Sequence, residues 1–257
     1  MRIAILGAGH IGGACVKGFV KAGETDLVLT AKSEETLSKF DSSIDTTLDN
    51  KTAVEGADII VIAVKTPSFA EVAEQIRGIL LPNQIVACMA AQVTPEELTA
   101  SLENGDGVLP KIAYVIPNTA AEVGESMTFI SDVSAGADGL KTLADLFSKI
   151  GLTSVVGREL LSPAISLASC GMGYAIKYIS AAVQAGLAVG LESDDAVRTV
   201  IQTVKGSAIL LSAHGGFPER ELRKVATPGG LTEKGVMAMD EAGFNEAVVK
   251  GVKASLK

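Results

Sequence analysis

A glycine-rich turn at the start of the chain constrains the fold more than any other feature. Residues 2–6 form a short apolar run typical of a strand, and Gly7-Ala8-Gly9-His10-Ile11-Gly12 follows directly and opens a helical pattern over residues 11–22. In such a G-x-G-x-x-G turn, Gly7 permits the tight bend, Gly9 lets the backbone approach a pyrophosphate, and Gly12 allows close helix–sheet packing. The free N–H groups at the start of the helix favour an anion. The sequence therefore predicts a dinucleotide-binding site at this turn.

The first part of the chain alternates short apolar runs with helical patterns. Strands are predicted at residues 2–6, 26–30, 43–46, 58–64, 84–89, 111–115, 128–131 and 153–156, and helices at residues 11–22, 34–40, 69–80, 95–102 and 137–150. A continuous apolar strand such as residues 59–64 suits a parallel sheet that is covered on both faces. Strands that alternate with helices indicate βαβ units. We therefore expect an α/β domain with a doubly wound (Rossmann) parallel sheet over residues 1–158.

The second part of the chain is predicted to be helical. After residues 157–159 the β-branched runs give way to helical patterns at residues 163–191, 194–213, 218–225 and 232–242. Ser193, followed by Asp194 and Asp195, has the pattern of an N-cap with acidic residues in the first turn. An all-α domain over residues 159–257 is therefore expected.

The end of the second predicted strand indicates which dinucleotide is bound. An NAD site usually has an acidic residue there, which binds the ribose hydroxyl groups. This strand ends Thr30-Ala31-Lys32-Ser33, and its acidic residue, Asp26, lies at its beginning. Lys32 and the Ser33 hydroxyl group can instead hold a 2′-phosphate, although Lys32 also fits an ordinary solvated lysine. NADP(H) is the preferred cofactor on this interpretation, and NAD(H) stays open as the alternative.

Composition and charge exclude several classes of function. Of the 257 residues, 47% are hydrophobic and only 4% aromatic, with no Trp, and the net charge is −8. A chain this apolar is not disordered, and its acidity argues against a nucleic-acid partner. Cys15, Cys88 and Cys170 are too widely spaced for a disulfide framework and are typical of a reducing compartment, so a cytoplasmic location is expected. His10 and His214 have no neighbours at metal-ligand spacing, and no metal is expected.

One apolar stretch, residues 164–191, is long enough to span a membrane and carries a single charge. Its polar residues Lys177, Ser180 and Gln184 form one narrow stripe at helical spacing, and four glycines interrupt it. We therefore expect a helix buried on most of its surface, within the protein or a dimer, and no membrane partner. Small side chains let two such helices approach closely, which predicts a homodimer or a larger homo-oligomer that assembles through the C-terminal helices.

Several further motifs occur in a fixed order along the chain. They are Asp49-Asn50, Ala63-Val64-Lys65-Thr66-Pro67, Met89-Ala90-Ala91-Gln92-Val93-Thr94, Ile116-Pro117-Asn118-Thr119-Ala120 with residues 123–128 after it, and Thr227-Pro228-Gly229-Gly230-Leu231-Thr232 with Gly243-Phe244 after it. The motif that begins at Ala63 is similar to a family motif AVKP, and the one that begins at Met89 is similar to AAGVT. The motif at Ile116 is similar to MPNTP…VGEGMT, and the one at Thr227 is similar to SPGGTT…GGF. Together with the glycine turn, this series resembles the pyrroline-5-carboxylate reductases of proline biosynthesis over nearly the whole chain.

The resemblance implies a layout and a reaction. The family has an N-terminal Rossmann domain and a C-terminal helical domain that interlocks with a second subunit, and the substrate lies between the nicotinamide and the partner's Pro-Gly-Gly loop. The implied reaction is hydride transfer from NADPH to a cyclic imino acid, 1-pyrroline-5-carboxylate, which gives L-proline. By this resemblance, the cofactor-contacting positions are His10, Ile11, Ser33, Asn50, Ala63, Lys65 and Ala91, and Thr227 and Thr232 match substrate-contacting positions.

The Pro-Gly-Gly loop suits a substrate carboxylate. Gly229 and Gly230 expose backbone N–H groups, and the dipole of the helix that follows favours an anion. Thr232 can offer its hydroxyl group to the ring nitrogen and is the expected catalytic residue. The alternative for Thr227 and Thr232 is simple helix capping. Asn118 is expected at the substrate cleft, with an Asx-type turn as its alternative.

The chain departs from the family pattern mainly in the substrate motifs. The family's SGSGPAY corresponds to Ala168-Ser169-Cys170-Gly171-Met172-Gly173-Tyr174, and Gly215 and Phe217 stand where the family has the acid and the imidazole of a Glu-x-His-Pro pattern. Leu231 replaces a threonine and Gln92 a glycine. Two other functions therefore stay open, namely a related NADP-dependent imine or keto-acid reductase and a dinucleotide-binding protein without catalytic activity.

Overall fold

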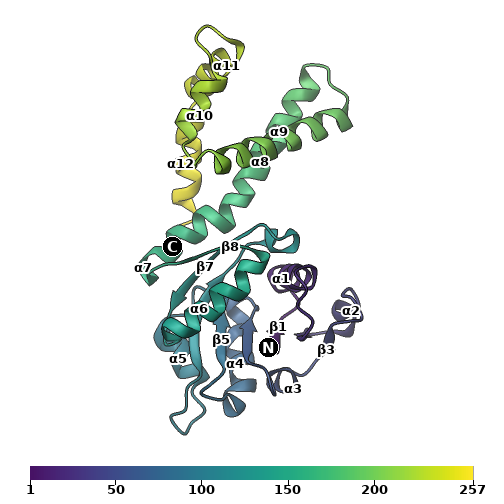
Figure 1. The fold of residues 1–257 in the computed structure, drawn as a ribbon, viewed down its shortest axis with the longest axis vertical. Helices are drawn as coiled ribbons and strands as arrows, with labels where there is room; N and C mark the ends of the chain where they lie inside the picture. The colour runs from purple at the N-terminus through teal and green to yellow at the C-terminus, as the bar shows by residue number, and fades with distance from the viewer. Residues whose placement is uncertain (257) are drawn as a thin grey trace. The chain divides into compact units, whose positions relative to one another are not determined.

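The structure, a computed structural model, describes residues 1–256 and divides into two compact units, Met1–Ser169 and Cys170–Lys257. The first unit contains a single eight-stranded sheet (Figure 1). Its strands are β1 (Ile3–Leu6), β2 (Leu27–Thr30), β3 (Asp45–Thr47), β4 (Ile59–Ile62), β5 (Ile85–Cys88), β6 (Lys111–Ile116), β7 (Ser126–Asp132) and β8 (Gly151–Val155). The strand order is β3-β2-β1-β4-β5-β6-β7-β8.

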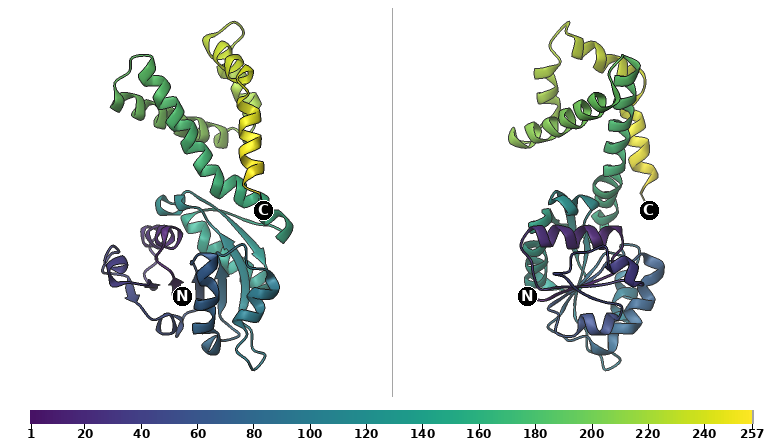
Figure 2. Two further views of the ribbon diagram at one scale, coloured as in Figure 1. Left: turned by 180° about the vertical axis from the view of Figure 1, so that it is seen from behind. Right: turned by 90° about the vertical axis from the view of Figure 1, so that its right-hand side faces the viewer.

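Helices cover both faces of this sheet (Figure 2). One core contains side chains of α1 (His10–Lys21) and α6 (Gly136–Phe147) packed on the strands. The other contains side chains of α3 (Asn50–Val54), α4 (Thr66–Ile76), α5 (Pro95–Leu102) and α7 (Arg158–Ile165). All four residues of β1, β2, β4 and β5 are buried, as a sheet covered on both faces requires. The predicted doubly wound fold is confirmed.

The expected strands are all present, but the sheet is not wholly parallel. β7 runs antiparallel to β6, while every other neighbouring pair is parallel. The connection from β6 to β7 contains only a short 3₁₀ segment, η2 (Thr119–Val123). A parallel pair needs a crossover of a dozen or more residues, so this short connection returns the chain in the opposite direction.

Short helices complete the first unit. α2 (Glu34–Leu37) begins after Ser33, whose side chain accepts a hydrogen bond from the Thr36 N–H group. The 3₁₀ segments η1 (Arg77–Ile79) and η3 (Ser148–Ile150) extend α4 and α6. α5 begins at Pro95 with a complete capping box, in which Thr94 and Glu97 satisfy each other's backbone N–H groups.

The second unit is all-α, as predicted. It contains α8 (Gly171–Ala188), α9 (Ser193–Ala213), α10 (Pro218–Val225), α11 (Leu231–Glu241) and α12 (Phe244–Ala254). The Tyr174 hydroxyl group donates to the Gly251 carbonyl oxygen at 3.0 Å, and the Tyr178 and Phe244 rings meet edge to face, so α8 packs on α12. α9 begins one residue earlier than expected, with Glu192 in place of Ser193 as its N-cap residue.

The helix predicted at residues 163–191 is two helices. α7 ends at Ile165, a π-helical turn follows over Ser166–Cys170, and α8 begins at Gly171. A π turn adds a residue per turn without interrupting the apolar composition, so the sequence pattern does not reveal it. Within residues 1–256, no helix is long and apolar enough to cross a membrane.

Candidate active site

The carboxyl ends of five strands in the first unit surround a cavity of about 920 Å³. Its lining comes from the segments that follow β1, β2, β4, β5 and β6. The chain leaves β1 for α1 on one face and leaves β4 for α4 on the other, so the cavity lies at the topological switch point of the sheet. Open α/β sheets bind their ligands at this position.

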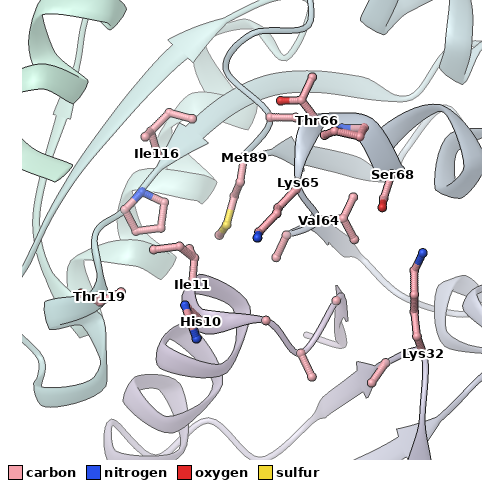
Figure 3. Close-up of a pocket in the computed structure, with 18 of the residues that line it drawn as sticks. His10, Ile11, Lys32, Val64, Lys65, Thr66, Ser68, Met89, Ile116 and Thr119 are labelled. Atoms are coloured by element: carbon pink, nitrogen blue, oxygen red, sulfur yellow. The ribbon is translucent and has the colours of Figure 1, made fainter. Parts of the chain in front are cut away.

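Most of the predicted cofactor residues meet in this cavity. Those that line it are Gly7, Gly9, His10, Ile11, Lys32, Ala63 and Lys65. Figure 3 shows the Lys65 side chain directed into the cavity beside Met89, with His10 and Ile11 on the opposite wall. Lys65 is the N-cap residue of α4, so its backbone stands at the start of that helix. Two lysines, two exposed helix starts and few other charges make the lining suited to an anionic ligand.

The glycine turn has the geometry that its pattern predicts. Gly7 has a φ of +111°, and a Cβ atom there would lie 2.8 Å from the Val64 side chain. A Cβ atom on Gly12 would lie 2.0 Å from the Gly7 carbonyl oxygen, so the third glycine is required by packing alone. A Cβ atom on Gly9 would meet nothing within 4 Å, which leaves space above the turn for a ligand.

The start of α1 also fits a pyrophosphate. Among the described residues, no side chain caps this helix and its first turn contains no acidic residue. Its first N–H groups are therefore available to an anion, and the space above Gly9 brings that anion within reach.

A smaller cavity of about 330 Å³ extends the site along β2. It shares Gly7 and Lys32 with the large cavity and adds Asn50 from α3. The Gly7 N–H group donates to Thr30 Oγ1 (3.2 Å), and the Thr30 hydroxyl group donates to Asn50 Oδ1 (2.6 Å). Asn50 Nδ2 in turn donates to Gln75 Oε1 on α4 (2.7 Å). This chain of hydrogen bonds fixes the glycine turn and Asn50 to one another.

Four predicted residues of the first unit are not among the described residues that line either cavity. Gly12 lies beneath the turn, and Ser33 caps α2. The Ala91 carbonyl oxygen accepts a hydrogen bond from Arg158 (3.0 Å). Asn118 is buried, accepts from the Ala120 N–H group (3.0 Å) as the N-cap residue of η2, and donates to the Ala168 carbonyl oxygen (3.3 Å). It therefore forms the Asx-type turn that was its alternative role.

Apart from Asn118, the predicted substrate residues lie in the second unit, in the loop between α10 and α11 and the first turn of α11. Gly229 has a φ of +74°, and its N–H group donates to the Glu233 carboxylate (2.7 Å). The Gly230 N–H group donates to the Thr227 carbonyl oxygen (2.9 Å). The N-cap residue of α11 is Gly230, and Thr232 is exposed in the first turn. Neither threonine is the N-cap residue of α11, so the capping alternative is wrong for this helix.

Several lining residues were not predicted from the sequence. Met89 and Gln92 come from the turn after β5, and Ser68, Glu71 and Gln75 come from α4. A signal for the α4 residues exists, because positions 71 and 75 are four apart and lie on one face of a helix that starts at the switch point.

Comparison with known proteins agrees with this arrangement. A family model described as pyrroline-5-carboxylate reductase dimerisation matches residues 158–257, and one described as NADP oxidoreductase, coenzyme F420-dependent, matches residues 2–91. Pyrroline-5-carboxylate reductase 2 of Dictyostelium discoideum is 30% identical over 272 residues, which cover 99% of this chain and 90% of the relative. The chain belongs to the pyrroline-5-carboxylate reductase family.

Other relatives extend the comparison. Pyrroline-5-carboxylate reductase 1 of the same organism is also 30% identical, over 98% of this chain. This chain spans about half (48%) of the length of that relative. The crystal structure of Plasmodium falciparum pyrroline carboxylate reductase with NADP bound has the same fold, with a TM-score of 0.87, 22% identity and coverage of 99% of this chain and 95% of that one.

The structure places the departures from the pyrroline-5-carboxylate reductase pattern at four sites. Gln92 lines the large cavity. Cys170 ends the π-helical turn, and Gly171 begins α8. Gly215 has a φ of +85° in the turn between α9 and α10, and Leu231 is 87% exposed at the start of α11. Three of the four sites are in segments that the family resemblance assigns to the substrate, and the fourth, Gln92, lines the cofactor cavity.

Proposed function

We propose that this chain reduces 1-pyrroline-5-carboxylate to L-proline with NADPH. The observation that carries the proposal is the cavity at the switch point, where the glycine turn, Lys32 and Lys65 meet in a chain of the reductase family. The names of the Dictyostelium relatives, the NADP bound to the Plasmodium protein and the NADP oxidoreductase model over residues 2–91 support this choice. When bound, the cofactor supplies the hydride that reduces the C=N bond.

The residues of the first unit have distinct roles toward the cofactor. The N–H groups at the start of α1 bind the pyrophosphate, with Gly9 leaving the space for it. Lys32 and Ser33, at the end of β2, bind the 2′-phosphate, and Asn50 is held by Thr30 and Gln75 to face the adenosine ribose. His10, Ile11, Ala63, Lys65 and Ala91 complete the cofactor contacts.

The residues of the second unit act on the substrate. A protonated cyclic imine is already electrophilic, so the protein's task is to place its carbon atom and hold its carboxylate. The loop of Gly229 and Gly230 at the start of α11 binds the carboxylate: the Gly229 N–H group exchanges the exposed Glu233 carboxylate for that of the substrate, the first N–H groups of α11 after Gly230 add to it, and Thr227 contributes its hydroxyl group. Thr232 donates a hydrogen bond to the ring nitrogen. Asn118, in the first unit, is proposed to orient the segment after β6 for substrate binding.

We infer that the functional form is a homodimer or a larger homo-oligomer. Within residues 171–188, α8 has no residue that is buried in a single chain, and the apolar side chains of Ile176 and Leu187 are exposed. A second subunit that covers these side chains agrees with the dimerisation model over residues 158–257. The proposed domains are residues 1–158 for NADP binding and 159–257 for dimerisation and substrate binding. Its three widely spaced cysteines favour the cytoplasm, and its net charge of −8 argues against a nucleic-acid partner.

The activity is tested by following NADPH oxidation with 1-pyrroline-5-carboxylate, then with a panel of other cyclic imines and of keto acids. The proposal expects the highest kcat/KM with 1-pyrroline-5-carboxylate and proline as the product. A preference for another imine or for a keto acid would overturn the substrate assignment in favour of a related reductase. Tight NADPH binding without turnover of any compound would indicate a dinucleotide-binding protein that is not an enzyme.

The role of Thr232 is tested in the same assay. Thr232→Ala should lower kcat by about 10²-fold, as expected for loss of a donor to a reacting group, while the Kd for NADPH stays unchanged. A near-normal kcat would remove Thr232 from the reaction. Sedimentation gives the assembly, and a folded, active monomer would contradict the proposed homo-oligomer.

A further inference from the structure

The smaller cavity contains an acidic residue opposite the lysine that is proposed to bind the 2′-phosphate. Its lining includes two charged residues, Lys32 at the end of β2 and Glu71 in the middle of α4. Lys32 Nζ and Glu71 Oε2 are 3.4 Å apart. Figure 3 shows Lys32 extended toward the α4 side of the site, where Ser68 lies one turn before Glu71. The carboxylate therefore occupies the position from which an anionic group would contact Lys32.

The ion pair is exposed, whereas the floor of the cavity is fixed. The Lys32 and Glu71 side chains are 77% and 60% exposed, so water competes effectively with the pair and either group is free to turn to a ligand. Beneath them, Asn50 is held by hydrogen bonds to Thr30 and to Gln75, one turn after Glu71 on α4. Glu71 and Lys32 are thus the two adjustable charges above a rigid base.

These observations bear on how the site distinguishes the two dinucleotides. NAD sites have an acidic residue that accepts hydrogen bonds from the adenosine ribose hydroxyl groups, and in the usual arrangement it stands at the end of the second strand. In this chain that strand, β2, ends at Thr30 and is followed by Ala31 and Lys32. The acidic residue comes instead from α4, across the cavity.

We propose that Glu71 determines the balance between NADP(H) and NAD(H). With a 2′-hydroxyl group in the cavity, the Glu71 carboxylate accepts its hydrogen bond and Lys32 balances the charge. With a 2′-phosphate in the cavity, Glu71 repels its negative charge and competes for Lys32. The chain therefore favours NADP(H) less strongly than Lys32 alone would dictate. This inference depends on the proposed dinucleotide role of the first unit, and not on the substrate.

The experiment measures binding without turnover, using the full-length chain. Calorimetric titrations with adenosine 2′,5′-bisphosphate and with AMP report the 2′-phosphate separately from the rest of the cofactor. The variant is Glu71→Gln, and the matched control is Glu74→Gln. Glu74 lies on the same helix and forms a similarly exposed ion pair with Arg77 (3.0 Å), but it lines neither cavity. Both variants remove one negative charge from α4.

Glu71→Gln should bind the bisphosphate about three- to tenfold more tightly, as expected for removing one charge a few ångströms from a doubly charged group in a solvated site. It should bind AMP equally or more weakly, and the gain should shrink as the salt concentration rises. Glu74→Gln should leave both affinities within about twofold of the wild type, and Lys32→Gln should weaken the bisphosphate selectively.

Equal effects of Glu71→Gln and Glu74→Gln on the bisphosphate would overturn the proposal, because the effect would then be one of net charge. An equal gain for AMP and the bisphosphate with Glu71→Gln would overturn it as well, because the 2′-phosphate would not be involved. Wild-type binding of both probes without reduction of any imine would leave this inference standing and overturn only the proposed reaction. Failure of the wild type to bind either probe would overturn both.

Discussion

Arg158 joins the start of α7 to the turn that follows β5, and this contact leads to our most detailed prediction. Its guanidinium group lies 4.3 Å from the centroid of the Tyr114 ring, and its Nη2 donates to the Ala91 carbonyl oxygen at 3.0 Å. The buried Tyr114 hydroxyl group donates to the Val93 carbonyl oxygen at 2.5 Å. Burial raises the pKa of Tyr114 to about 12, so the hydroxyl group stays protonated at neutral pH. The two side chains together hold the turn that carries Gln92 into the large cavity.

We expect Arg158→Met to destabilise the first unit by about 2–4 kcal/mol. A cation–π contact contributes about 0.5–2 kcal/mol, and a hydrogen bond from a charged donor contributes about 1.5–3 kcal/mol. The side chain is half-buried, so the lower part of the combined range applies. Met preserves most of the apolar stem, which separates these contributions from lost packing.

Urea unfolding measures the loss of stability, and calorimetry with NADP⁺ measures the effect on the site. A loosened turn beside the cavity should raise the Kd for NADP⁺ several-fold. Arg77→Met is the control, because Arg77 forms only an exposed ion pair with Glu74, and its loss should cost less than about 1 kcal/mol. A double-mutant cycle with Tyr114→Phe should show coupling, since both side chains hold the same turn. If Arg158→Met is no more destabilising than Arg77→Met, and the NADP⁺ affinity is unchanged, the reasoning is refuted.

Single substitutions test the contacts of Thr30, Gly12 and Glu221. Thr30→Val removes a buried hydroxyl group that accepts from the Gly7 N–H group and donates to Asn50. Its loss should lower the free energy of unfolding in urea by about 1–3 kcal/mol and weaken NADP⁺ binding measured by calorimetry. Unchanged NADP⁺ binding would contradict the positioning role of Thr30. Gly12→Ala places a Cβ atom 2.0 Å from a carbonyl oxygen of the turn, so calorimetry should detect little or no NADP⁺ binding even where circular dichroism shows a folded chain. Hydrogen bonds from Lys224 and then His214 lower the pKa of Glu221 from 4.5 to about 2. Because the folded-state pKa of Glu221 lies below its unfolded-state pKa, the ionised carboxylate stabilises the fold above pH 4.5, and this stabilisation is lost as the pH falls toward 2. The difference in free energy of unfolding between wild type and Glu221→Gln should therefore shrink over that range. A difference that stays constant with pH would exclude the charge of the carboxylate as its source.

The parts of the fold that were predictable depend on local pattern. The apolar run at residues 59–64 identified β4, and the glycine turn identified both the start of α1 and the site above it. Residues 95–102 form α5 as predicted, because Thr94 and Glu97 complete a capping box and Pro95 fits the first turn. In each case a few neighbouring residues carry the whole signal.

The parts that were not predictable depend on contacts between segments. α12 has no counterpart among the predicted helices, since its N-cap residue is Gly243 and it has no capping side chain within the described residues. The direction of β7 depends on the length of the connection between β6 and β7. The π turn before α8 depends on one inserted residue. Glu71 enters the site only because β4 and β2 place α4 opposite Lys32, and no motif of consecutive residues records that arrangement.

The turn between α9 and α10 shows that the absence of a family motif does not establish the absence of the functional groups that the motif supplies. Gly215 and Phe217 replace the acid and the imidazole of the reductase family's Glu-x-His-Pro pattern. An imidazole and a carboxylate nevertheless meet beside this turn, because His214 Nδ1, directly after α9, lies 3.0 Å from the buried carboxylate of Glu221 in α10, which Lys224 also contacts at 2.8 Å. Glu221 lies about one helical turn after Phe217, so the two residues are close in space although residue 221 is not part of the Glu-x-His-Pro motif. The region between α9 and α10 therefore keeps an acid–imidazole pair although the two family residues are replaced. The substrate-binding capacity of the second unit has to be judged from such contacts and not from the motif alone.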